Sequence, residues 1–501
     1  MKARSGFKVA VIGAGVSGLF MAERLLRAGI DFTVYEKASD LGGTWRDNTY
    51  PGLFVDVLSR QYEFPFRPNF DWSRKFASQP EIQAYLLRVA RERGWRQHIR
   101  FNTEIIEAVF DSGRWQLRTS DGQTDTVDVL ISATGFLREP KLPDISGREG
   151  FAGMAFHSAR WDHGVALEGK RVGVIGSGAS GIQIAETLAA SGIAVTHFVR
   201  RPQWIHVREN PRSTLLGRLA LRLPFAYRFR SRQLWRWLGG MDLWRTQPGP
   251  ARDAVAIELA KPLEAMRDPE LREKLRPRMP VGCVRIPKSD KNYYAAMELP
   301  NAQVEVRRIE RIEPDGICME DGTLLGLDVL VYATGFDAQA YMRPMRLIGA
   351  NGVSIEECWK NGVFSYRGVS LPDFPNFFML YGPFSPVNNV PIPIGLDQQT
   401  DYILRVIDAA RTRKAVAAPS REATDRFVSD VRRKLPDTVW TGCPNWYRGD
   451  GDTEILWPFT QEEHRQMLLD LRLDDLDFTP LASFEGALSV SEVGSSKGVA
   501  V

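Results

Sequence analysis

The chain has 501 residues, of which 44% are hydrophobic and 25% are charged, an ordinary balance for a globular protein of about two or three domains. Its 65 basic and 61 acidic residues give a net charge of +4, which is too balanced to indicate a nucleic-acid-binding protein. The first residues contain no signal-peptide pattern, and no apolar run is long enough to cross a membrane. We therefore expect a cytoplasmic protein.

A dinucleotide-binding fingerprint lies near the N-terminus. The residue pattern predicts a strand, a helix and a second strand, over residues 8–12, 19–28 and 32–35. Between the first strand and the helix, Gly13 allows a tight turn, Gly15 lets the backbone approach a pyrophosphate, and Gly18 permits close helix–strand packing. Glu36 follows the second strand and can accept hydrogen bonds from both ribose hydroxyls, which favours FAD or NAD.

Two segments after Glu36 fit contact with a flat cofactor. The first is Gly42-Gly43-Thr44-Trp45, in which a glycine pair precedes an aromatic residue. The second runs from Tyr50-Pro51-Gly52 to Asp56, whose carboxylate follows a turn in an apolar, aromatic neighbourhood. A carboxylate in such a place needs a partner, and the alternative is an ordinary surface turn residue.

An internal repeat indicates a second nucleotide-binding unit. Segments 128–136 and 328–336 each combine an apolar strand with Ala-Thr-Gly, where a backbone can touch a cofactor. Between them, a predicted strand over 171–175 leads into a second glycine fingerprint, which is followed by a helix and a strand over 194–199. The glycines of this fingerprint are Gly176, Gly178 and Gly181.

Arg200 and Arg201 stand in the second unit where the first unit has Glu36. A guanidinium at this position suits the 2′-phosphate of NADP, because it can form charge-assisted hydrogen bonds with it. The sequence therefore predicts FAD or NAD in the first unit and NADP in the second. The alternative is a solvated arginine pair on an exposed loop.

Residues 211–247 contain eight arginines and a single acid, Asp242, interleaved with Leu, Phe, Tyr and Trp. We expect a helical insertion in the second unit over about 210–278. Such an insertion can cover a substrate entrance or touch an anionic membrane surface. The residue pattern is equally typical of an ordinary surface helix with a solvated basic face and a buried apolar face. Nothing in it resembles a nucleic-acid-binding motif.

The four cysteines, Cys283, Cys318, Cys358 and Cys443, are far apart and form no Cys-x-x-Cys pair. This spacing supports neither a disulfide framework, nor a zinc site, nor a redox dithiol. We therefore expect reduced, structural thiols, as is usual in cytosolic proteins, and no metal site.

The segment that joins the two units carries a signature. It fits the pattern F-x-G-x-x-x-H-x-x-x-W-[PD] with Phe151, Gly153, His157, Trp161 and Asp162. With both fingerprints and both Ala-Thr-Gly strands, the chain resembles the Baeyer–Villiger monooxygenases, a branch of the flavin-containing monooxygenases that bind FAD and NADPH. The branch that oxygenates N and S usually has Tyr or Phe in place of Trp161. The resemblance covers about residues 7–470.

The resemblance implies an α/β fold with two Rossmann-like domains, one for FAD and one for NADP, and a helical insertion in the NADP domain. From Asp328 onward the chain is expected to return to the FAD domain. The expected division is FAD domain 1–150, signature linker 151–165, NADP domain 166–325, second part of the FAD domain 326–482, and a disordered tail 483–501.

The resemblance also implies two catalytic residues. Arg285 matches the family's arginine in a Gly-Cys-Lys-Arg-type motif, and Asp56 matches the aspartate after Tyr-Pro-Gly. In such enzymes NADPH reduces the flavin and O₂ adds to give a C4a-peroxyflavin, which attacks a ketone to yield an ester or lactone. The arginine stabilises the peroxide anion, since it stays charged at any working pH, and the aspartate holds and tunes the arginine.

One residue departs from the family's pattern. Val284 replaces the lysine that in this family helps to hold the 2′-phosphate of NADPH. The strictness of the preference for NADPH over NADH is therefore open, and Arg200 and Arg201 can compensate for the missing lysine. The resemblance implies that His157 lies at the joint between the two domains rather than beside the reacting groups.

Three other functions compete with this interpretation. A heteroatom oxygenase would use the same flavin chemistry, but Trp161 and the Asp56–Arg285 pair argue against it. A disulfide reductase would need a Cys-x-x-Cys motif. A non-catalytic nucleotide sensor would be expected to lose Asp56 or Arg285. The ketone and the oligomeric state are left open.

Overall fold

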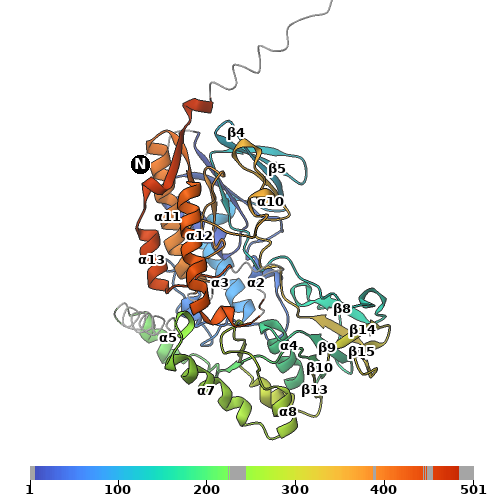
Figure 1. Ribbon diagram of the computed structural model, residues 1–501. Coiled ribbons are helices and arrows are strands. Elements are labelled where there is room, and N and C mark those ends of the chain that lie inside the picture. The colour runs from blue at the N-terminus through green and yellow to red at the C-terminus, as the bar shows by residue number, and fades with distance from the viewer. Residues whose placement is uncertain are drawn as a thin grey trace, which may run out of the picture.

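The computed structural model describes residues 6–223, 225, 244–387, 391–443, 445, 447 and 455–484 (Figure 1). The tail expected to be disordered lies outside these residues from 485 onward, as does much of the arginine-rich segment 211–247. Within the described part of the chain, no helix combines the length and the apolar character that crossing a bilayer requires.

The first nucleotide-binding unit is built on a parallel five-stranded sheet of order β19-β7-β1-β2-β3. Its strands are β1 (Lys8–Ile12), β2 (Asp31–Tyr35), β3 (Ile99–Arg100), β7 (Val129–Ser132) and β19 (Phe377–Met379). Its main helices are α1 (Val16–Ala28), α3 (Gln79–Glu92) and α11 (Ile392–Thr412). Strand β1 has the predicted bounds, and its side chains are buried because helices cover both faces of a parallel sheet.

Helix α11 begins at Ile392, with Pro393 in its first turn. Proline is tolerated in the first turn of a helix, where its missing N–H has no partner to lose, so the chain near Pro393 is helical. Helix α11 packs against α1 and α13 (Gln461–Leu469). Helices α11, α12 (Arg421–Lys434) and α13 lie along one side of the molecule (Figure 1).

A second parallel sheet has the order β13-β10-β9-β17-β8. Its strands are β8 (Met154–His157), β9 (Arg171–Ile175), β10 (Ala194–Phe198), β13 (Ala302–Glu305) and β17 (Val329–Tyr332), with helices α4 (Ala179–Ala190) and α9 (Tyr293–Met297) packed together beside it. The expectation that the chain returns to the first unit at Asp328 is wrong, because β17 pairs with β9 and β8 in this sheet.

Smaller elements surround the two sheets. A four-stranded sheet contains β4 (Ile105–Asp111), β5 (Arg114–Thr119), β6 (Thr124–Val127) and β18 (Arg346–Ile348). A three-stranded sheet contains β14 (Ile309–Glu313), β15 (Gly316–Met319) and β16 (Leu324–Gly326). Two-stranded pairs are β11 (His206–Val207) with β12 (Lys288–Ser289), and β20 (Ala415–Pro419) with β21 (Leu476–Pro480). The short helices are α2 (Thr44–Asp47) and α10 (Ile355–Cys358).

The described residues of the predicted insertion contain three helices. They are α5 (Leu215–Leu221), α7 (Pro250–Glu264) and α8 (Pro269–Lys274). They lie below the first unit in the view of Figure 1, on the side of the molecule opposite β4 and β5.

The expectation of four reduced cysteines is wrong for two of them. Cys283 and Cys443 form a disulfide, with their Cα atoms 6.0 Å apart, whereas Cys318 and Cys358 are free. The two partners are 160 positions apart in the sequence, so their spacing held no sign of the pairing. The fold creates it by placing the turn before Arg285 against the loop after Trp440.

We expect Cys283→Ser to lower the free energy of unfolding by about 2–5 kcal/mol, because a disulfide that closes so long a loop restricts the unfolded chain. Thermal unfolding of oxidised protein should show a lower midpoint for this variant than for the wild type. In dithiothreitol the two midpoints should converge, and Cys358→Ser should lose no disulfide contribution. Equal midpoints under oxidising conditions would contradict the assignment.

Candidate active site

A cavity of about 1770 Å³ runs between the two nucleotide-binding units. Its lining includes residues of both glycine fingerprints and both Ala-Thr-Gly turns, together with Asp56 and Arg285. Pockets for one small ligand usually measure about 300–1,000 Å³. The cavity therefore has room for more than one large ligand.

The two fingerprints have the same local geometry. A Cβ atom added to Gly13 would lie 2.8 Å from the carbonyl oxygen of Ala133, and one added to Gly176 would lie 2.3 Å from that of Ala333. Both glycines have positive φ angles, 104° and 121°, which other residues adopt at a cost. Each Ala-Thr-Gly turn thus lies against the first glycine of its own unit, as the internal repeat suggested.

The third glycine of each fingerprint permits close packing of helix on strand. A Cβ atom at Gly18 would lie 1.8 Å from the Gly13 oxygen, and one at Gly181 would lie 1.8 Å from the Gly176 oxygen. Such contacts exclude any side chain. The N-termini of α1 and α4 are thereby held at the cavity, where their free N–H groups favour phosphate.

Glu36 lies at the edge of the cavity and is almost completely buried. Its carboxylate accepts hydrogen bonds from the backbone N–H groups of Ala14 (2.8 Å) and Ala38 (2.9 Å), and from the Arg46 guanidinium (3.1 Å). These donors fix the carboxylate beside the first fingerprint. It lies at the end of β2 and beside the first fingerprint, the position that the sequence pattern predicted.

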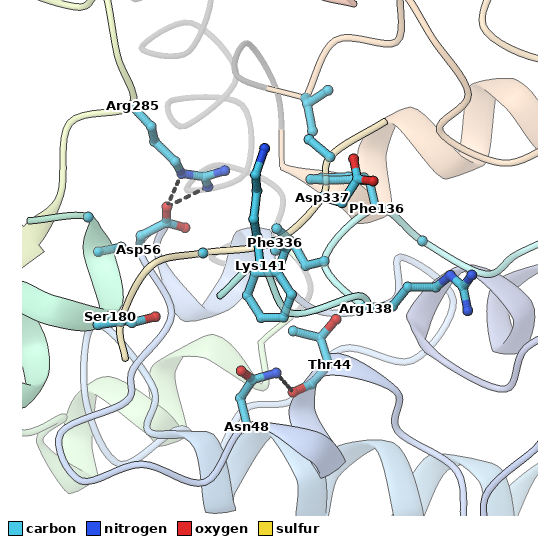
Figure 2. Close-up of a pocket in the computed structure, with 18 of the residues that line it drawn as sticks. Thr44, Asn48, Asp56, Phe136, Arg138, Lys141, Ser180, Arg285, Phe336 and Asp337 are labelled. Carbon is cyan, nitrogen blue, oxygen red and sulfur yellow. Dashed lines mark hydrogen bonds and ion pairs between the residues drawn. The ribbon is translucent and has the colours of Figure 1, made fainter. Parts of the chain in front are cut away.

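The segment after Glu36 also lines the cavity, through Gly43, Thr44 and Trp45. The Gly43 backbone approaches Gly15 so closely that a Cβ atom would lie 3.0 Å from the Gly15 Cα atom. The Trp45 indole N–H donates a hydrogen bond to the Tyr62 hydroxyl (2.9 Å), which fixes the ring in place. Figure 2 shows Thr44 in the lower part of the close-up, beside Asn48.

Arg200 and Arg201 follow β10 and are exposed at the cavity, near the second fingerprint. The Arg201 backbone oxygen accepts a hydrogen bond from Ser177 Oγ (2.9 Å). Among the described residues, neither guanidinium has a hydrogen-bond or ion-pair partner. Both are thus available to an anionic ligand that enters the second unit.

Asp56 and Arg285 lie next to each other in the cavity lining and form an ion pair, although they are far apart in the sequence (Figure 2). Arg285 Nε and Nη2 both donate to Asp56 Oδ2, at 3.0 and 2.5 Å. Asp56 comes from the first unit, after the Pro-Gly turn, and Arg285 comes from the loop before β12. The interpretation of Asp56 as a plain surface turn residue is thereby excluded.

The ion pair determines the charge of both groups. Burial would raise the pKa of the Asp56 carboxyl, but Arg285 outweighs this effect and holds the pKa below its usual range. In the opposite direction, Asp56 raises the pKa of Arg285 against the effect of burial. Both groups are therefore charged at neutral pH, and Arg285 still has N–H groups for a ligand.

The chain matches the model of the flavin-binding monooxygenase-like family over residues 6–213. An uncharacterised monooxygenase of Mycobacterium tuberculosis is 41% identical over 483 residues, which are 95% of this chain and 97% of that protein. A Baeyer–Villiger monooxygenase of Streptomyces coelicolor is 38% identical over 471 residues, which are 92% of this chain and 90% of that enzyme. The chain belongs to the Baeyer–Villiger monooxygenases. It is a flavin-dependent monooxygenase.

Solved structures of other Baeyer–Villiger monooxygenases have the same fold. The structure described as OTEMO in complex with FAD and NADP superposes with a TM-score of 0.86 and 28% identity, over 95% of this chain and 99% of that one. The expected α/β architecture, with two Rossmann-like domains, is confirmed.

The Baeyer–Villiger signature lies outside the cavity lining. Its residues 154–157 form edge strand β8 of the second sheet, so this segment is more than a linker. Phe151 and Gly153 lie just before this strand. The backbone of Gly153 packs so closely that an added Cβ atom would lie 2.4 Å from the Asp328 oxygen and 2.7 Å from the Phe151 ring. His157 is buried, and burial lowers its pKa. Its Nδ1 accepts from the Ala159 N–H (3.1 Å).

The end of the signature is also structural. The Trp161 ring lies edge-on against Phe156, with centroids 5.1 Å apart, and Asp162 Oδ1 accepts a hydrogen bond from the Gly164 N–H (2.8 Å). These contacts shape the connection into β9. The signature thus identifies the Baeyer–Villiger monooxygenases through their domain joint rather than through their reacting groups.

The sequence pattern did not reveal three basic residues that line the cavity, His206, Arg208 and Lys288. His206 and Lys288 pair across the short strands β11 and β12. Lys288 follows Arg285 by three positions and lies outside the recognised motif. Strands β11 and β12 are far apart in the sequence, so no local pattern predicted the pairing of His206 with Lys288. The His-Val-Arg alternation at 206–208, after the predicted NADP arginines, was the one available signal.

Proposed function

We propose that this Baeyer–Villiger monooxygenase uses FAD and NADPH to insert one atom of O₂ next to a ketone carbonyl, which gives an ester or lactone. The observation that carries the proposal is the Asp56–Arg285 ion pair in a cavity shared by two dinucleotide fingerprints. In balance, ketone, O₂, NADPH and a proton give ester, water and NADP⁺.

The residues present fit both cofactors. The first fingerprint offers a backbone cradle that a Cβ atom would fill at Gly13 and Gly18, with the Glu36 carboxylate beside it for a ribose. These features support FAD in the first unit. In the second unit, Gly176, Gly178 and Gly181 would hold the pyrophosphate of NADPH, and Arg200 and Arg201 its 2′-phosphate.

The chain's own residues would then bind the cofactors, orient the reacting groups and stabilise the developing negative charge. When bound, the flavin supplies electrons from NADPH to O₂ and so activates an oxygen atom for transfer. Arg285 provides a fixed positive charge beside the oxygen that becomes negative, and a preorganised charge costs no reorganisation during the reaction. Asp56 holds that guanidinium in place through its two hydrogen bonds. Both units form walls around the site, which keeps water from the reacting atoms.

Product analysis tests this function against heteroatom oxidation. Purified protein with FAD and NADPH is given a panel of cyclic, aryl and linear ketones and a matched panel of sulfides, and products are scored by a mass gain of one oxygen. We expect esters or lactones from ketones, with one NADPH consumed per product. Sulfoxide formation with no ester from any ketone would reject the proposal in favour of the heteroatom oxygenase.

We expect Arg200→Ala to raise the KM for NADPH about ten- to a hundred-fold, because one charge-assisted contact to a phosphate contributes roughly 1.5–3 kcal/mol. NADH lacks the 2′-phosphate, so its KM should barely change. Steady-state kinetics with both nucleotides measure this selectivity. Arg267→Ala, which removes an exposed arginine away from the cavity, should leave it as in the wild type. Unchanged selectivity in Arg200→Ala would assign the 2′-phosphate to another residue.

A further inference from the structure

A group of basic side chains lies in the cavity beside the Asp56–Arg285 pair, and no step of the proposed reaction uses it. Lys288 and His206 face each other on paired strands, with Lys288 Nζ 3.4 Å from His206 Nδ1. Arg208, two positions after His206, donates from Nε to His206 Nε2 at 2.9 Å. We call Lys288, His206 and Arg208 the basic niche.

The niche places two basic side chains, Lys288 and Arg208, around one imidazole. Burial, Lys288 and Arg208 together lower the pKa of His206 to about 3, so its imidazole is neutral at neutral pH. A neutral imidazole has a single acceptor nitrogen, so it cannot accept hydrogen bonds from Lys288 and Arg208 at once. Among the described residues, Lys288 has no carboxylate within ion-pair distance.

Asp56 is the carboxylate whose charge acts most on Lys288. Its Oδ2 atom already accepts two hydrogen bonds from Arg285. Burial lowers the pKa of Lys288 to about 7, with further lowering by the cations of Arg208, Arg245 and Arg285. An anion placed beside Lys288 would favour its charged form.

The niche lies at the Arg285 end of the cavity, so the anion that it would bind is expected on the substrate rather than among the cofactor phosphates. The glycine cradle and Arg200–Arg201, which suit the phosphates of the nicotinamide cofactor, lie at the ends of β9 and β10. Lys288 instead lies on β12, three positions after Arg285, and its charge interacts with both Arg285 and Asp56. A molecule that reaches both groups would have its ketone near Arg285 and its charge near Lys288.

We propose that the preferred substrate is an oxo carboxylic acid, whose carboxylate Lys288 binds with help from Arg208 while the ketone lies beside Arg285. This proposal rests on the proposed function. An ammonium can direct several N–H groups at a carboxylate, and such charge-assisted bonds are strong in a site with little water. The niche therefore selects among ketones by charge.

The first test compares oxo acids of graded chain length, and a cyclohexanone with a ring carboxylate, with the methyl ester of each. In the wild type we expect kcat/KM for at least one acid to exceed that for its ester about ten- to a hundred-fold. Lys288→Met should remove most of this ratio, and Lys288→Glu should reverse it. Lys291→Met is the matched control, since Lys291 is exposed and lies outside the cavity lining.

The second test measures binding without turnover. Calorimetric titration of the FAD-loaded protein with cyclohexanecarboxylate, and with the neutral cyclohexanecarboxamide, should show tighter binding of the carboxylate in the wild type but not in Lys288→Met. If carboxylate binding depends on Lys288 but no ketone is oxygenated, the site stands and the proposed reaction fails. If ketones are oxygenated with no acid preference, the proposed reaction stands and this inference is overturned.

A third measurement separates substrate from cofactor. NADP⁺ affinity is determined by equilibrium dialysis for the wild type, Lys288→Met and Arg200→Ala. We expect a large loss for Arg200→Ala and little change for Lys288→Met. A loss in Lys288→Met as large as that in Arg200→Ala, with the acid-to-ester ratio unchanged, would assign the niche to a cofactor phosphate and overturn the inference.

Discussion

Arg285→Ala should reduce ketone oxygenation by on the order of 10²–10³-fold, because it removes a preorganised cation from the place where negative charge develops. FAD should still bind, since the first fingerprint and Glu36 lie in another part of the cavity. NADPH should then be consumed with release of hydrogen peroxide instead of ester. The measurement is the yield of ester and of peroxide per NADPH oxidised, with bound flavin confirmed by its absorbance.

Arg285→Lys is the matched control for this experiment. A lysine keeps one positive charge but not the planar fork that gives Asp56 two hydrogen bonds from Nε and Nη2. We expect it to recover part of the ester yield. The neighbouring Val284 offers no cation that could take over. Ester formation by Arg285→Ala at nearly the wild-type rate and yield would remove Arg285 from the chemistry.

Asp56→Ala should slow turnover by roughly 10²-fold while the protein stays folded and flavinated. Loss of the carboxylate leaves the Arg285 charge half-buried without its partner, and truncating one member of such a pair costs about 2–5 kcal/mol. The guanidinium would then keep its contact with Tyr447 but lose the two hydrogen bonds to Asp56 that fix it. Stopped-flow traces of flavin reduction by NADPH and of reoxidation by O₂ show which half-reaction slows.

Asp56→Asn separates the charge of this residue from its shape. The amide oxygen can still accept a hydrogen bond from Arg285, but it brings no negative charge. We therefore expect an intermediate rate, and flavin absorbance like that of the wild type. Wild-type rates in both half-reactions for Asp56→Ala would show that the ion pair is structural only.

The sequence predicted much of the site because each glycine fingerprint is formed by residues that are close together in the chain. The first fingerprint, Glu36 and strand β1 fall within a short stretch of chain, so the spacing of glycines and apolar residues was sufficient. The Asp56–Arg285 contact spans the two units, and it was anticipated only through the family resemblance. The structure contains this ion pair, and the catalytic roles of the two residues stay a prediction.

Other features depend on long-range packing that no local pattern contains. The Cys283–Cys443 disulfide and the His206–Lys288 strand pair form only when distant loops meet in the fold. Strand β17 was assigned to the wrong unit for a related reason. Its apolar residues suit any buried parallel strand, and only the pairing with β9 shows which sheet it joins.

The order of strands in the first sheet has a consequence for synthesis on the ribosome. Strand β7 pairs on one side with β1 and on the other with β19, which follows the entire second sheet in the sequence. While the chain emerges, β7 must therefore present an unpaired edge until residues 377–379 arrive, and such edges promote aggregation. The second sheet, whose strands all lie between 154 and 332, is free to fold before the first is complete. Nascent chains that stall before β19 should thus be the ones that most need chaperones.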